Sequence, residues 1–128
     1  MARNWLTLDA GRASVLAALC EAIVPCSSRV APAVYIDAKL AGVDDATRAA
    51  TLAAIDGLAD VADKGAEGLA DKVMTPDFLM LRALAIEAYY SDFVAPGAEG
   101  PGAWDEIDFR FPLADRIVHD WSYLGIPG

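Results

Sequence analysis

The fold is decided by the stretch TPDFLMLRALAIEAYY, residues 75–90. It opens with a capping threonine, a proline that suits the first helical position and an acid that faces the positive end of the helix dipole. We expect a helix that continues to about Phe93. Arg82 and Glu87 are the only charges in its middle. A helix without a polar face is typical of a central position with contacts on several sides.

The residues before this stretch predict two more helices near the N-terminus. The first covers residues 7–24, with Thr7 as a candidate N-cap, and it ends because Pro25 cannot continue it. After a loop, Pro32 suits the first position of a second helix. Gly42 fits the C-terminal end of that helix.

A third helix is predicted from a cap at Asp44 or Asp45 to about Ala62. One face carries apolar residues at helical spacing, and aspartates fall on the opposite, solvated face. The apolar positions are Leu52, Ile55, Leu58, Ala59 and Ala62, and the acidic ones are Asp56, Asp60 and Asp63. Two glycines then break the pattern, so residues 65–74 are expected to form a loop or a short frayed turn.

The character of the chain changes after residue 94. Residues 95–102 hold several glycines and prolines, and a short helix is predicted at 113–120. No strand alternation or internal repeat is present. We therefore expect an all-α fold, a small bundle of four to five helices forming one domain over residues 1–128. Residues 1–94 would be the helical core and residues 95–128 an irregular, aromatic-rich C-terminal tail.

Composition restricts the function. With 128 residues and a 55% hydrophobic content, the chain is one domain with a real core. Its net charge of -9 makes binding to a nucleic acid backbone a poor hypothesis, since Lys and Arg carry that binding. No apolar run approaches the roughly 18 to 20 residues of a membrane span. No signal peptide is visible, so we expect a cytoplasmic location.

The chain has few residues that commonly carry catalysis or bind metals. It holds one histidine, His119, and two cysteines, Cys20 and Cys26. Zinc sites and di-iron bundles need more such ligands, and no Gly-x-Gly-x-x-Gly fingerprint is present. We expect no catalytic, metal-binding or cofactor-binding residues in this chain. Two reduced thiols, with Cys20 in the core, are favoured over a disulfide. A small enzyme that uses His119 with acids such as Asp108, Asp115 and Asp120 stays a less favoured hypothesis.

The tail holds more large apolar residues than a small helical core readily uses, in a region rich in glycine and proline. Such side chains are enriched at the buried centres of protein interfaces. We therefore predict a partner-binding role for this set, which consists of Trp104, Phe109, Phe111, Trp121, Tyr123 and Leu124. The alternative, that the tail wraps back over its own bundle, has about equal weight, and both can hold for different residues.

Three pieces of the chain together resemble the small component, gamma or subunit 3, of gluconate 2-dehydrogenase and related FAD-dependent oxidoreductases. Leu6-Thr7-Leu8 followed by residues 15–25, ending in Ala-Ile-Val-Pro, is similar to the opening helix of that family. Residues 81–90 resemble its long helix ending in paired aromatics. The closing run, residues 121–128, resembles its aromatic tail rich in glycine and proline.

The resemblance implies a non-catalytic accessory subunit. Its partner would be a large flavoprotein of the glucose-methanol-choline type that acts on a sugar or alcohol and carries the FAD. Members of the family commonly have a twin-Arg leader for export, which this sequence lacks, and a cytoplasmic variant fits better. A free-standing helical adaptor or regulator that binds an unrelated protein is the alternative function.

Overall fold

The computed structural model describes residues 3–109 and 125, and within them the chain is helical with no strand. The predicted all-α class is confirmed. The helices are α1 Ala10–Ile23, α2 Pro32–Ala41, α3 Asp45–Gly57, α4 Gly65–Leu69, α5 Pro76–Tyr90 and α6 Ala103–Glu106. Short 3-10 turns are η1 Ser27–Val30, η2 Ala62–Lys64 and η3 Ala70–Lys72. None of the described helices is long and apolar enough to cross a membrane.

Several predicted helix boundaries are confirmed by their capping contacts. The Asp44 carboxylate accepts from the backbone N–H of Thr47 at 2.6 Å, at the start of α3. Thr75 caps α5, and Pro76 is its first residue. Pro32 likewise opens α2, and Gly42 ends it.

Other boundaries differ from the prediction. Thr7 is not the N-cap of α1, because Asp9 takes that place and accepts from the backbone N–H of Arg12 at 2.8 Å. The third helix ends at Gly57, not near Ala62, and α5 ends at Tyr90, not near Phe93. Residues 65–74, predicted as a loop or a short frayed turn, contain α4 and η3, and the predicted irregular segment contains α6.

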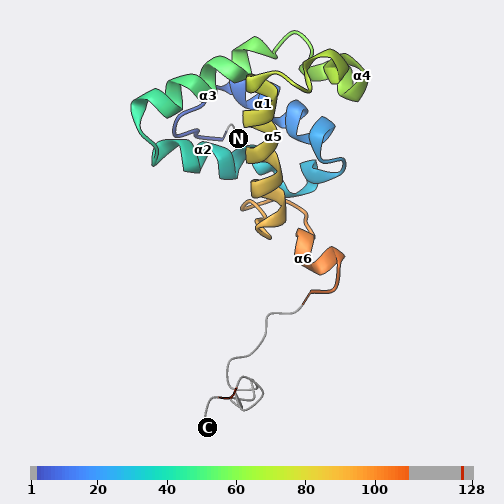
Figure 1. Ribbon diagram of the computed structural model, residues 1–128. Helices are drawn as coiled ribbons and strands as arrows, with labels where there is room; N and C mark the ends of the chain where they lie inside the picture. The colour runs from blue at the N-terminus through green and yellow to red at the C-terminus, as the bar shows by residue number, and fades with distance from the viewer. Residues whose placement is uncertain (1–2, 110–124, 126–128) are drawn as a thin grey trace.

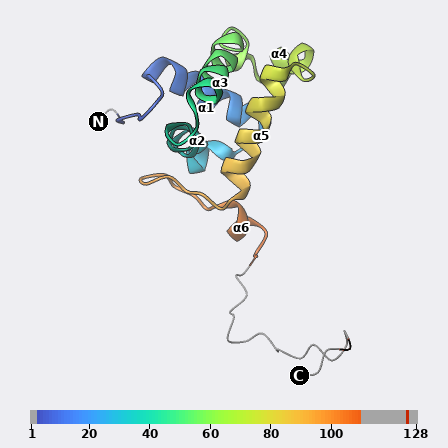
Figure 2. The ribbon, with the colours of Figure 1, turned by 60° about the vertical axis from the view of Figure 1, so that its left-hand side comes forward.

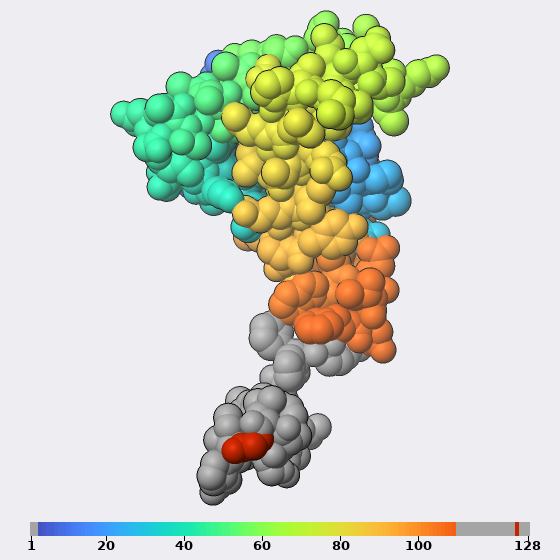
Figure 3. All heavy atoms as spheres, viewed as in Figure 1, coloured from blue at the N-terminus to red at the C-terminus, as the bar shows by residue number. Residues whose placement is uncertain are grey.

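α5 lies at the centre of the bundle, as its sequence predicts. It contacts α1, α2, α3 and α6 (Figure 1), and the same arrangement is seen after rotation in Figure 2. One strip of α5 remains at the surface and includes Leu79, Arg82 and Ala83. In Figure 3 the yellow helix α5 reaches the surface between the teal and green elements on one side and the blue α1 on the other.

The main core is built from side chains of all four long helices. Its fully buried members include Leu16 and Leu19 of α1, Ile36 and Leu40 of α2, Ile55 of α3 and Leu81 of α5. Burying each such side chain contributes roughly 1.5 to 3 kcal/mol of transfer free energy. A smaller cluster joins η1 to the end of α5 and to α6 through Val30, Tyr89 and Ala103.

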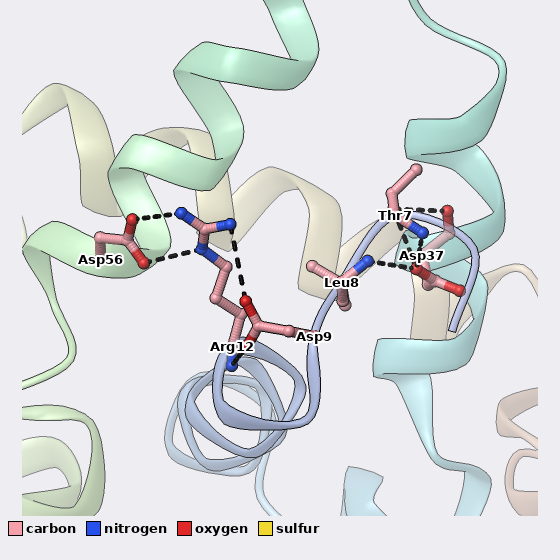
Figure 4. Close-up of polar contacts among 6 residues, drawn as sticks. All are labelled: Thr7, Leu8, Asp9, Arg12, Asp37 and Asp56. Atoms are coloured by element: carbon pink, nitrogen blue, oxygen red, sulfur yellow. Dashed lines mark hydrogen bonds and ion pairs between the residues drawn. The ribbon is translucent and has the colours of Figure 1, made fainter. Parts of the chain in front are cut away.

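A buried aspartate fastens the N-terminal segment to α2 (Figure 4). The Asp37 carboxylate accepts backbone N–H bonds from Thr7 and Leu8 at 2.9 and 3.0 Å, which Figure 4 shows. A third backbone N–H bond comes from Leu6 at 2.8 Å. It also accepts the Thr7 hydroxyl at 2.9 Å. Burial alone would raise the pKa of Asp37, but these hydrogen bonds outweigh it and lower the pKa. Thr7 therefore binds α2 instead of capping α1.

Candidate partner-binding surface

Two of the six predicted partner-binding residues lie within the described part of the chain. Trp104 is on α6 and Phe109 follows that helix. Phe111, Trp121, Tyr123 and Leu124 lie outside the described residues, as does the helix predicted at 113–120. The geometry below therefore bears on Trp104 and Phe109 alone.

The structure brings Trp104 and Phe109 together at the end of α5. Their rings are 5.1 Å apart between centroids, edge to face, and the backbone N–H of Phe109 donates to the Trp104 carbonyl at 2.8 Å. The Trp104 indole N–H donates to the backbone carbonyl of Tyr90 at 3.1 Å. The backbone N–H of Trp104 donates to the Asp92 carboxylate, also at 3.1 Å. These contacts fix Trp104 against the last turn of α5.

Four apolar side chains at this end form what we call the aromatic surface, namely Tyr90, Trp104, Ile107 and Phe109. Tyr90 is 58% exposed, Ile107 72% and Phe109 46%, whereas Trp104 is partly buried. Single exposed apolar residues are common on protein surfaces, whereas several exposed apolar side chains at one end of a molecule are a feature of many interaction sites. Aromatic rings with few rotatable bonds are typical anchors of such sites.

One arginine ties α6 to the rest of the bundle. Arg29 of η1 donates from Nη2 to Glu106 Oε2 at 2.7 Å and to the Tyr89 hydroxyl, and from Nε to the Pro101 carbonyl at 3.1 Å. The Tyr89 hydroxyl in turn donates to Glu106 Oε2 at 2.5 Å. The Arg29 guanidinium also lies 5.6 Å from the centroid of the Tyr89 ring. We call Arg29, Tyr89 and Glu106 the arginine latch.

The electrostatics of the arginine latch favour the charged forms of its ionic members. The pKa of Glu106 is lowered, first by the hydrogen bond from Tyr89 and then by that from Arg29. The pKa of Arg29 is raised by its hydrogen bond to Glu106. Burial raises the pKa of Tyr89, so its phenol stays protonated and can keep donating to Glu106. At neutral pH Arg29 and Glu106 therefore carry the charges that their ion pair requires.

Sequence reasoning did not find the arginine latch or the Asp37 contacts. Arg29 is separated from Tyr89 by 60 residues and from Glu106 by 77, so no spacing signal connects them. The one available hint for Asp37 was a charge within an otherwise apolar helical pattern. Such a residue needs a partner when it is buried.

The two cysteines lie in different environments. Cys20 and Cys26 are both free, and Cys20 is buried while Cys26 is exposed. Burial raises the pKa of the Cys20 thiol to about 12. No group of three or more His, Cys, Asp or Glu residues that could hold a metal ion occurs within residues 3–109 and 125. His119, Asp115 and Asp120 lie outside the described residues.

The acidic residues of the third predicted helix also differ in their surroundings. Asp60 and Asp63 are exposed, as expected of a solvated face. Asp56 is exposed as well, but it accepts two hydrogen bonds from the Arg12 guanidinium, at 2.9 and 2.8 Å, and so joins α3 to α1 (Figure 4). Hydrogen bonding to Arg12 lowers the pKa of Asp56.

Comparison of the chain with protein-family models, curated proteins and solved structures gives no match.

Proposed function

We propose that this protein is a non-catalytic accessory subunit that binds and stabilises a large FAD-dependent oxidoreductase acting on a sugar or alcohol. The observation that carries the proposal is the exposed aromatic surface at the end of α5. It contains both described members of the predicted partner-binding set. The class of partner comes from the resemblance of residues 6–8 with 15–25, of 81–90 and of 121–128 to the small subunit of gluconate 2-dehydrogenase.

The arrangement of the site supports binding in preference to chemistry. The aromatic surface offers apolar area and edge-to-face rings, which gain free energy when a partner removes them from water. The arginine latch holds α6 in place before any partner arrives, so less conformational entropy is lost on binding. Under this proposal the FAD and the catalytic groups belong to the partner, and the two free thiols suit the cytoplasm.

The direct test is co-expression of this chain with a large FAD-dependent oxidoreductase of the glucose-methanol-choline type from the same organism. Size exclusion chromatography would report a complex, and the flavin absorbance spectrum would report FAD loading of the large subunit. We expect co-elution, and less FAD-loaded large subunit when the small chain is omitted. A large subunit that folds, binds FAD and turns over equally well alone would contradict the proposal. Capture of a different, flavin-free partner would favour the adaptor hypothesis.

Variants of the aromatic surface test where the partner binds. Phe109→Ser and Ile107→Ser each remove exposed apolar area without touching the main core. We expect each to weaken the complex by about tenfold or more, as for an interface anchor. Met74→Ser is the matched control, because Met74 is 81% exposed but lies away from α6. Equal dissociation constants for all three variants would place the interface elsewhere.

A further inference from the structure

A second feature of the molecule is a hollow whose lining contains none of the four residues of the aromatic surface. This hollow of about 400 Å³ opens between the N-terminal segment, α1 and the start of α2. Small side chains of α1, including Ala13, Ser14 and Ala17, line one side, and Ala31 and Pro32 line the other. Binding pockets for small molecules have about this size and are lined mostly by apolar groups with a few polar ones.

One wall of the hollow is an aromatic ring held in place by the Asp37 contacts. Trp5 lines the hollow and packs against the main core. The next three residues, 6–8, are the ones whose backbone N–H groups donate to the Asp37 carboxylate. The position of Trp5 is therefore set by hydrogen bonds to a buried charge, which are among the stronger hydrogen bonds in proteins.

The hollow also has a cation at its rim. Arg3 lines it, and the Arg3 guanidinium carbon lies 6.0 Å from the centroid of the Trp5 ring. Arg3 forms no ion pair within the described residues, and its one hydrogen bond there is a long one of 3.4 Å to the Pro96 carbonyl. This contrasts with Arg29, whose guanidinium is held by Glu106.

A second hollow adjoins the first, and Arg3, Ser28 and Ala31 line both. Its lining is more polar and includes Glu99 as well as Arg29. Arg3 lines both hollows, so a cationic group lies where the apolar lining around Trp5 and the alanines meets the more polar lining. An occupant that matches both the apolar lining and the cation has an apolar body and one anionic group.

We propose that this hollow binds a small organic monocarboxylate whose apolar body, aromatic or short aliphatic, lies against Trp5 and the alanine-lined face of α1. Its carboxylate would accept hydrogen bonds from the Arg3 guanidinium, a pairing that is stronger than one between neutral groups. The ligand takes the place of water on the apolar lining, which supplies the rest of the binding free energy. This site is independent of the flavoprotein partner proposed above.

The test uses the full-length chain and three compounds that share one body, 2-naphthoate, 2-naphthamide and 2-naphthylmethylammonium. Isothermal titration calorimetry would measure each dissociation constant. We expect saturable binding of 2-naphthoate at one site, binding of the neutral amide about tenfold weaker, and no binding of the cation.

Two variants and two matched controls localise the binding. Arg3→Gln should raise the dissociation constant of 2-naphthoate about tenfold and leave that of 2-naphthamide unchanged, since only the carboxylate pairs with the charge of Arg3. Ala17→Leu should fill the hollow and abolish binding of both compounds; Ala17 is exposed, so the fold tolerates the change. Arg82→Gln and Ala53→Leu alter exposed residues outside the hollow and should change nothing.

Three results would overturn the proposal. The first is that 2-naphthoate shows no saturable binding. The second is that Arg3→Gln and Ala17→Leu leave its dissociation constant unchanged. The third is that Phe109→Ser abolishes binding, which would place the compound on the aromatic surface. None of these measurements involves the flavoprotein. Failure of this site and failure of the proposed subunit function are therefore separate results.

Discussion

The carboxylate of Asp37 accepts two hydrogen bonds from Thr7, one from its backbone N–H and one from its hydroxyl, both at 2.9 Å. The two residues are 30 positions apart, and the contact joins the N-terminal segment to the middle of α2. The extended residues that precede α1 thereby become part of the folded domain. Four consequences for stability and reactivity can be measured, and each follows from a contact described above.

Replacement of Asp37 by asparagine should destabilise the protein by about 2 kcal/mol, the range for hydrogen bonds to a charged group. The amide nitrogen of the new side chain can donate but not accept, so one of the N–H groups of residues 6–8 loses its acceptor. Urea unfolding would measure the change in the free energy of unfolding. Asp60→Asn, at an exposed position, is the control and should be neutral.

Part of the stability that the protein loses in acid should be lost through protonation of the same carboxylate. Because the pKa of Asp37 is lower in the folded state, its contribution to stability is present above the unfolded value of about 3.9 and is lost as the pH falls through the folded pKa. Asp56, Glu87 and Glu106 also have lowered pKa values, so all variants lose stability in acid. The free energy of unfolding of Asp37→Asn should therefore fall less than that of the wild type between about pH 5 and pH 2. Parallel curves of unfolding free energy against pH would contradict this assignment.

The central position of α5 predicts a large difference between two leucines two residues apart. Leu81 is 1% exposed within the main core, whereas Leu79 is 44% exposed. Leu81→Ala should lower the free energy of unfolding by about 3 kcal/mol because it removes buried methyl groups and leaves a cavity. Leu79→Ala should change stability by less than about 1 kcal/mol. Similar thermal midpoints for the two variants would be inconsistent with the helix orientation described here.

The two thiols should differ in reactivity. Iodoacetamide at about pH 8 should add one label to the native protein, at the exposed Cys26, because alkylation requires an accessible thiolate. Cys20 is buried and the pKa of its thiol is raised to about 12, so it should react only after unfolding in urea. Peptide mass spectrometry would identify the labelled residue. Labelling of Cys20 in the native protein would mean that α1 opens at its C-terminal end.

Local signals in the sequence were sufficient for the long helices. Thr75, Pro76, Pro32 and Asp44 act through neighbours within a few residues, so their effect can be read without the fold. The predicted capping role of Thr7 is wrong because its hydroxyl donates to Asp37, a carboxylate on another helix. A capping preference is weak, and a tertiary contact of this kind overrides it.

The partner-binding surface was predictable only in part. The surplus of aromatic residues near the C-terminus predicts a role for Trp104 and Phe109. Tyr90 and Ile107 belong to the same surface only because of the way α5 and α6 meet. The arginine latch brings together η1, α5 and α6, and no local pattern marks a contact across so many residues. The hollow beside Trp5 depends on how three segments meet, which a linear pattern does not contain.

The mostly apolar surface of α5 has a consequence for the way the chain is made. The helices that cover it, α1, α2 and α3, all precede it in the sequence. The ribosome releases the chain from its N-terminus, so the covering helices have already emerged when α5 appears. A circular permutant that began at α5 would present its apolar helix first, without cover, and would be the version of this domain most prone to aggregate.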